Sequence, residues 1–339
     1  MSKAAELANL IGNINAGGGG VNKNVIINGN MNVAQRGTST TGLGANGGNY
    51  STVDRFSTYA NATDGRFTMT QDSSAPSGFA NSLKLDCTTA DTSIAAGEIL
   101  LLRHMIEGQN LQAFAKGTSD AKPFALSFYV KGNASATYVA ELYDEDNNRQ
   151  VSKSFTVGTD WARVELSMGA DTTGAFDDDN ASSMTFQIWL HGGSSYTGGT
   201  LNTTWGSVTQ ANRAAGISSF FDSTDRTFFI TGVQLEVGQN PTEFEHEPVE
   251  RTLAKCQRYY GDGAYRNRNY GNHTGGGYNQ SWANIEFKKE MRAAPTVTTS
   301  ASQLGFTTTV DKTTIQSYSV SSSDAFFDNN LTWTADAEL

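Results

Sequence analysis

The chain has 339 residues, of which 37% are hydrophobic and 17% charged, and its formal net charge is −10. No cluster of Lys and Arg offers a track for nucleic acid or for an anionic membrane surface, and no apolar run approaches the roughly 18 residues of a membrane-spanning helix. The 35 glycines and the many Asn, Ser and Thr residues disfavour helices, because they compete for backbone hydrogen bonds or lose conformational entropy there. The N-terminus lacks the apolar core of a signal peptide, so we expect synthesis in a cytoplasm.

Residues 1–21 predict one short helix followed by a flexible tether of four glycines at positions 17–20. Leu7, Leu10, Ile11 and Ile14 recur at i, i+3, i+4 and i+7, which places them on one face of a helix. A helix this short is not stable alone in water. Its apolar face therefore docks either on its own domain or on other chains, and we predict a role in attachment and oligomerisation.

Residues 22–248 predict a β-sandwich of the jelly-roll type. Apolar and polar residues alternate with a period of two through most of this region, as in antiparallel strands that bury one face. Several such strands separated by turn-rich loops favour two packed sheets. The predicted strands are 83–87, 99–105, 124–131, 138–143, 151–157, 164–168, 184–191 and 228–237.

Residues 249–339 predict a second, smaller β-sandwich. Residues 251–260 form either a short helix or a bridge, and residues 261–280 predict a loop because they are very rich in Gly, Asn and Tyr. Shorter strands are predicted at 282–287, 296–300, 315–320 and 331–337. The predicted fold is therefore all-β, with a jelly-roll sandwich, a smaller C-terminal sandwich and a short N-terminal helix.

The two cysteines, Cys87 and Cys256, lie far apart in the sequence and form no Cys-x-x-Cys pattern. Two buried free thiols are the favoured prediction, and a single disulfide is the alternative.

Several segments resemble a known family. They are similar to segments of bacteriophage tail-fibre and other virion appendage proteins, and together they span residues 24 to 339. The segments are 24–37 (NVIINGNMNVAQRG), 230–238 (ITGVQLEVG), 242–245 (TEFE), 256–260 (CQRYY), 289–297 (KEMRAAPTV) and 334–339 (TADAEL). The resemblance implies a homotrimeric fibre with a jelly-roll domain similar to carbohydrate-binding modules, located in the virion tail and made in the host cytoplasm.

Three aromatic residues of the jelly-roll region are candidate glycan contacts. Trp189 is out of phase with the apolar residues around it, so the alternation places it on the polar face of its strand, where an indole can stack on a sugar ring. Tyr196 and Trp205 lie in the Gly- and Ser-rich loop that follows. The alternative for Trp189 is packing against a loop or a neighbouring subunit, and the alternative for Tyr196 and Trp205 is burial of the rings to close the loop.

The predicted loop 261–280 supplies Tyr265, Tyr270 and Tyr278, and Trp282 follows it. Tyr, Asn, Gly and Arg are typical of adaptable recognition loops, so we expect these residues to contact a polysaccharide. A trimer contact or a flexible loop is the alternative.

Metal and catalytic signals are weak. Asp177, Asp178 and Asp179 offer oxygen ligands for Ca²⁺, but they lack the spacing of an EF-hand and equally suit a turn. No catalytic serine elbow, zinc-protease motif or phosphate-binding loop is present. We therefore expect no cofactor and no enzymatic activity, although a pair of glycosidase carboxylates leaves no sequence signature.

These observations lead to one prediction and two alternatives. The chain is predicted to be a virion structural protein of the tail-fibre type, a homotrimer that attaches to host surface polysaccharide and binds other virion tail proteins through its N-terminal helix. The alternatives are a purely structural fibre or adaptor without glycan binding, and a polysaccharide-degrading tailspike-type enzyme.

Overall fold

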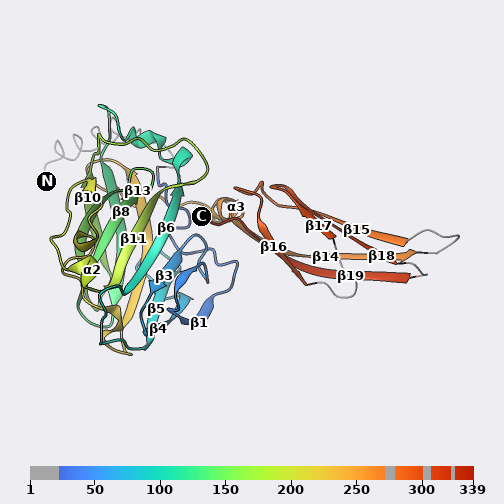
Figure 1. Ribbon diagram of the computed structural model, residues 1–339, viewed down its shortest axis with the longest axis horizontal. Coiled ribbons are helices and arrows are strands. Elements are labelled where there is room, and N and C mark those ends of the chain that lie inside the picture. The colour runs from blue at the N-terminus through green and yellow to red at the C-terminus, as the bar shows by residue number, and fades with distance from the viewer. Residues whose placement is uncertain (1–22, 272–278, 301–306, 322–324) are drawn as a thin grey trace. The chain divides into compact units, whose positions relative to one another are not determined.

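The computed structural model describes residues 23–271, 279–300, 307–321 and 325–339. The chain divides into two compact units, Met1–Pro248 and Val249–Leu339. Strands dominate both units (Figure 1). Among the described residues, no helix has the length and apolarity needed to cross a membrane. Leu7, Leu10, Ile11 and Ile14 fall outside the described residues, so the predicted attachment helix remains a prediction.

Two antiparallel sheets form the first unit. The six-stranded sheet runs β1 (Ser39–Leu43), β4 (Arg66–Asp72), β5 (Ser82–Thr89), β13 (Thr227–Val237), β7 (Phe124–Gly132) and β10 (Ala162–Gly169). The seven-stranded sheet runs β12 (Gly206–Ser207), β9 (Arg149–Val157), β8 (Ala136–Asp144), β11 (Ser182–Gly192), β6 (Ile99–Glu107), β3 (Ser57–Asn61) and β2 (Gly47–Asn49). The chain switches sheets repeatedly, for example from β5 to β6 to β7 to β8, as in a jelly roll. The predicted jelly-roll sandwich is confirmed.

Short helical turns occur only in the loops of this unit, within the described residues. They are η1 (Gly108–Asn110), η2 (Gln112–Phe114), α2 (Ser194–Thr197), η3 (Gln210–Asn212) and η4 (Phe220–Asp222).

The core lies between the two sheets and follows from the alternation. On β7, Phe124, Leu126, Phe128 and Val130 are all fully buried in one hydrophobic cluster. The ring of Phe128 lies 6.1 Å from that of Phe186 on β11, so side chains of the two sheets meet face to face. Burial of these apolar side chains stabilises the sandwich by about 1.5–3 kcal/mol each.

The two segments 24–37 and 230–238 lie against each other. The amide of Val25 donates to the carbonyl of Leu235 (3.0 Å), and the amide of Val233 donates to that of Gly29 (2.9 Å). A Cβ on Gly29 would lie 2.1 Å from the Val233 carbonyl oxygen, so only glycine fits there. The β13–β7 register shifts between Thr231 and Gln234, at this point of contact. Backbone packing therefore explains these segments without any ligand.

The described residues of the second unit form a helix and two three-stranded sheets. The helix is α3 (Val249–Cys256). One sheet runs β14 (Tyr260–Gly271), β19 (Ala325–Asp336) and β16 (Thr296–Ser300), and the other runs β15 (Asn279–Glu286), β18 (Thr314–Ser321) and β17 (Thr307–Val310). Ile285, Ile315, Trp333 and Ala335 come from both sheets and share one buried cluster, which confirms the smaller C-terminal sandwich.

The prediction of a loop over residues 261–280 is wrong for residues 261–271 and for residues 279 and 280, which begin β15. Residues 261–271 belong to β14, which pairs with β19 from Tyr260 opposite Asp336 to Gly271 opposite Ala325. Residues 272–278 are outside the described residues.

The segments 256–260, 289–297 and 334–339 also meet within this unit. The guanidinium of Arg292 donates to the carbonyls of Ala337 (2.8 Å) and Glu338 (3.0 Å). The Ala337 amide donates to the Tyr259 carbonyl at 2.8 Å. Like the first pair of segments, these three hold the ends of strands together.

Both cysteines are buried free thiols, as predicted. Burial raises the pKa of the Cys87 thiol to about 11.

Candidate functional site

Trp189 does not face solvent, so the premise of its prediction as a glycan contact is wrong. It lies on the outer face of β11, as its phase predicted, but it is fully buried together with Ile99, Leu101 and Val139. Its indole Nε1 donates to Oε2 of Glu141 at 2.7 Å. Residues of the loop after β11, among them Ala214, complete the cluster and cover this part of the sheet.

Tyr196 and Trp205 are partly buried and pack within the protein, which was the alternative for both. The Tyr196 ring lies 5.2 Å from that of Trp189. The Trp205 ring lies 5.4 Å from that of Phe124, and its Nε1 donates to the Gly169 carbonyl at 3.3 Å. Both rings therefore close the loop over the sandwich.

The candidates of the second unit are only partly described. Tyr265 lies on β14 and is partly buried against the core of that unit. Trp282 lies on β15 opposite Tyr318, and Tyr270 lies on β14 opposite Phe326, but the side chains of both are outside the described part of the chain. Tyr278 falls outside it altogether, so contacts of these residues with a glycan remain predictions.

Asp177, Asp178 and Asp179 are exposed, and the structure does not bring their carboxylates together as a cation site. The Asp179 carboxylate accepts from the Ala181 amide at 2.8 Å, as in an ordinary Asx turn. Calcium at this turn gains no support from the structure.

One group among the described residues has three metal-ligand types within reach of one another, namely Asp91, Glu98 and His191. All three are buried and already partnered. His191 contacts Glu98 (2.9 Å) through Nε2 and Ser219 (2.8 Å) through Nδ1, and Asp91 accepts from Thr63 and from the Asp64 amide at 2.8 Å. This network is complete without an ion.

An aromatic–arginine face lies on the outer side of the seven-stranded sheet and consists of Tyr59, Arg103, Tyr143, Gln187 and Arg213. The strand register sets Arg103 of β6 opposite Gln187 of β11, and Gln187 opposite Glu141 of β8. Their neighbours in sequence, including Leu102, Ile188 and Leu142, point into the core. Because side chains alternate along a strand, the face points away from the core.

Each tyrosine of this face is stacked with a guanidinium. Arg103 lies 4.8 Å from the centre of the Tyr59 ring, and Arg213 lies 4.8 Å from that of Tyr143. Both rings are partly exposed. Burial raises the pKa of Tyr143, with Arg213 opposing the rise, so its hydroxyl stays protonated at neutral pH.

Glu141 fixes one side of the face. It is fully buried, and its oxygens accept from Arg213 Nε (3.0 Å) and Nη2 (3.0 Å). The Gln187 amide also donates to it, as does Trp189. A carboxylate with this many donors holds Arg213 and Gln187 in fixed orientations before any ligand arrives.

Sequence reasoning missed this face, although one signal was available. Tyr143 and Arg103 both stand at positions out of phase with the core residues of their predicted strands, as Trp189 does. Arg213 and Tyr59 carried no signal, because they come from a loop and from a strand that the alternation did not indicate.

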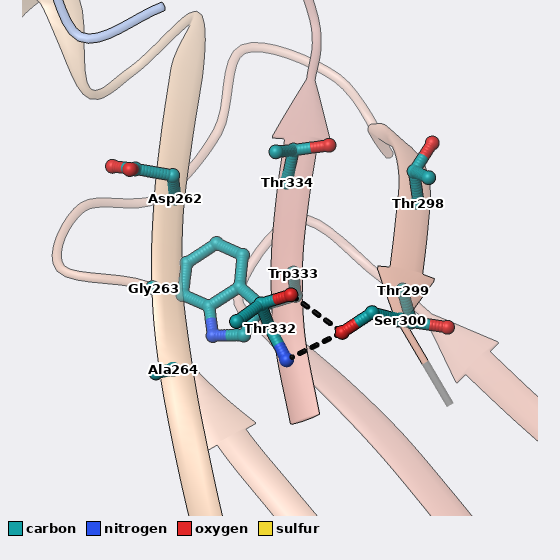
Figure 2. A pocket seen from close by; sticks show the side chains of 9 residues that line it. All are labelled: Asp262, Gly263, Ala264, Thr298, Thr299, Ser300, Thr332, Trp333 and Thr334. Atoms are coloured by element: carbon teal, nitrogen blue, oxygen red, sulfur yellow. Dashed lines mark hydrogen bonds between the residues drawn. The ribbon is translucent and has the colours of Figure 1, made fainter. Parts of the chain in front are cut away.

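The second unit has an open pocket of about 590 Å³ over one of its sheets. Figure 2 shows its lining on β14, β19 and β16, with Thr332 hydrogen-bonded to Ser300. Most of the lining residues are Thr, Ser or Asp, and the one ring, Trp333, is only 7% exposed and belongs to the core. The pocket therefore offers hydrogen bonds but little stacking surface.

No family model and no curated protein matches the chain. Comparison with solved structures finds carbohydrate-binding modules. One described as "CBM4 structure and function" has 9% identity and a TM-score of 0.32, over 63% of this chain and 99% of that chain. A family 11 module from Clostridium thermocellum, in complex with a β-1,3-1,4-mixed-linked tetrasaccharide, has 12% identity and a TM-score of 0.30, over 62% and 98%. TmCBM61 in complex with β-1,4-galactotriose has 7% identity and a TM-score of 0.31, over 63% of this chain and 99% of that chain. Similarity this low does not indicate what the present chain binds.

Proposed function

We propose that the chain is a non-catalytic glycan-binding protein and that the aromatic–arginine face of its first unit holds the carbohydrate. The observation that carries the proposal is the pair of partly exposed tyrosine rings, Tyr59 and Tyr143, each stacked with a guanidinium on the solvent side of a rigid sheet. Sugar rings have apolar C–H faces that stack on aromatic rings, and their hydroxyls take hydrogen bonds from guanidinium and amide groups.

Preorganisation favours this face over the other candidates. Glu141 holds Arg213 and the buried Gln187, so a ligand does not have to order the Arg213 guanidinium. Tyr59, Arg103, Tyr143 and Gln187 are on strands, which position side chains more accurately than loops do, and the loop residue Arg213 is held by Glu141. Trp189, by contrast, is buried beneath the loop that follows β11.

The wider role that we propose is host attachment by a bacteriophage virion. The resemblance of residues 24–37, 230–238 and 289–297 to tail-fibre proteins supports it. In this role the chain is a homotrimer, joined to other virion tail proteins through residues 1–21, and it binds host surface polysaccharide. Three linked sites raise avidity because the second and third binding events become intramolecular.

The test is affinity electrophoresis of the purified protein through gels that contain a panel of soluble polysaccharides, neutral and acidic. Tyr59→Ala and Tyr143→Ala each remove a stacking surface, and we expect each to weaken binding about tenfold, which corresponds to about 1.4 kcal/mol. The matched control is Tyr129→Ala, because Tyr129 is a partly buried tyrosine on the six-stranded sheet, with its ring 5.3 Å from that of Phe79.

Three outcomes contradict the proposal. If both tyrosine variants bind as the wild type does, the face is not the site. If no polysaccharide in the panel retards the protein, the purely structural alternative replaces glycan binding. If oligosaccharides are released during incubation, the protein is an enzyme.

A further inference from the structure

Within the described part of the chain, Arg103 has no hydrogen-bond acceptor. Its Nε is buried without a partner, and no carboxylate of the described residues forms an ion pair with it. Its guanidinium lies over the ring of Tyr59, 4.8 Å from the ring centre. Arg213, on the same face, is by contrast saturated by Glu141.

Other arginines of the first unit show how unusual this is. Arg149 pairs with Asp171, Arg163 with Glu165, and Arg226 with Asp222. A guanidinium remains charged in a protein, and burial opposes that charge, which lowers the pKa of Arg103. A partly desolvated cation without an acceptor is costly unless a ligand supplies one.

The surroundings leave the guanidinium available on this face. Gly48 of β2 lies beside it, and a Cβ there would come within 2.7 Å of Nη2, so a larger residue would displace the arginine. Of the neighbouring carboxylates, Glu141 is neutralised by Arg213, whereas Glu145 accepts a hydrogen bond from Thr185 and keeps its charge. Glu145 still favours a positive Arg103.

We propose that Arg103 receives an anionic group of the bound glycan, a carboxylate or a sulfate, and that the ligand is therefore an acidic polysaccharide. This inference rests on the proposed function and specifies its ligand class. The Arg103 guanidinium donates two parallel hydrogen bonds to the anion. The Tyr59 ring packs against this guanidinium, and the adjacent sugar ring stacks on Tyr143.

The experiment measures affinity for three probes: polygalacturonate, which carries carboxylates, carrageenan, which carries sulfates, and neutral mixed-linkage β-glucan. Wild-type protein is compared with Arg103→Met and Arg103→Lys. We expect at least one acidic probe to bind about tenfold more tightly than the neutral one, and we expect Arg103→Met to weaken binding of that acidic probe about tenfold more than it weakens binding of the neutral one. Arg103→Lys is expected to keep only part of the preference for the acidic probe, because an ammonium lacks the paired, planar donors of a guanidinium. The exposed Lys122→Met makes the same change of charge as a control and keeps the preference.

A stability measurement separates recognition from a structural role. Because no described residue accepts a hydrogen bond from Arg103, Arg103→Met is expected to keep the wild-type melting temperature. A large fall would show that the arginine holds the fold, and it would overturn the inference. Equal affinity for acidic and neutral probes would also overturn it, while loss of all binding in Tyr143→Ala would leave the proposed function standing. If none of the probes binds, both the proposed glycan binding and the inferred acidic ligand are refuted.

Discussion

Replacing Lys116 with methionine is expected to destabilise the first unit by about 3–5 kcal/mol, the usual cost of removing one partner from a buried ion pair. The Lys116 ammonium is fully buried and meets the carboxylates of Asp144 (2.5 Å) and Asp171 (3.2 Å). It also donates to the carbonyls of Thr173 (2.8 Å) and Gly174 (2.7 Å). It thus joins β8 to the loop after β10.

The magnitude follows from what methionine leaves behind. Its volume is similar, so the cavity is small, but Asp144 loses its cation while Asp171 keeps Arg149 at 2.8 Å. For a unit of this size, about 1 kcal/mol shifts the melting temperature by about 2–4 °C, so the expected fall is roughly 6–20 °C. Differential scanning calorimetry measures it, with the exposed Lys122→Met as a control that is expected to stay within about 0.5 kcal/mol of wild type. A loss below about 1 kcal/mol for Lys116→Met would refute the reasoning.

The ion pair of Lys116 with Asp171 also makes the stability of the first unit depend on pH in the acid range. Burial raises the pKa of Asp171, but hydrogen bonds from Arg149 and the Thr173 amide, together with Lys116, outweigh it and hold that pKa below its ordinary value. A carboxyl whose pKa is lowered on folding stabilises the protein above its unfolded pKa, about 3.9, and loses that contribution as the pH falls through the folded value. Since methionine removes one of these causes, the destabilisation by Lys116→Met is expected to be smaller at pH 3 than at pH 7.

Four further predictions concern packing and assembly. Lys116→Ala vacates a set of oxygen ligands of the kind that Ca²⁺ prefers, so millimolar Ca²⁺ is expected to raise the melting temperature of this variant and not of the wild type. Gly29→Ala is expected to cost more than 2 kcal/mol in urea unfolding, because its Cβ would lie 2.1 Å from the Val233 carbonyl oxygen; unchanged stability would contradict the packing of the two segments. Both buried thiols are expected to resist a thiol reagent at pH 8 and to react in denaturant, and reaction in the native protein would contradict their burial. The solution mass is expected to be that of a trimer for the full chain and of a monomer without residues 1–20; a full-length monomer would refute the fibre proposal.

The strands were predictable because their cause is local. Phe124, Leu126, Phe128 and Val130 alternate with smaller or polar residues, and the structure buries all four between the sheets. Alternation shows which side chains share a face, but it does not show whether the second face meets water. On β11 it assigned Trp189 to the outer face correctly, yet the loop that follows covers that face. Tertiary contacts of this kind leave no periodic signal in the strand itself.

The composition of residues 261–271 predicted a loop where the structure has a strand, for a related reason. Gly, Asn and Tyr residues are typical of recognition loops, but β14 pairs with β19 along its full length. Strand propensity is weak against such a partner, because a strand is stabilised by its neighbours rather than by its own residues. The candidate face was equally hidden, since Tyr59, Arg103, Tyr143 and Arg213 come from four separate segments that only the sheet brings together.

The outer face of the seven-stranded sheet has two parts, and Glu141 joins them. On one side it accepts from Trp189, beneath the loop that follows β11, and on the other it fixes Arg213 against Tyr143. The loop that removes Trp189 from solvent is also the segment that delivers Arg213. The loop that covers Trp189 therefore also places Arg213 in the aromatic–arginine face. A substitution that loosens the buried part, such as Trp189→Ala, would disturb recognition without touching the ligand, so loss of binding in that variant does not make Trp189 a contact residue.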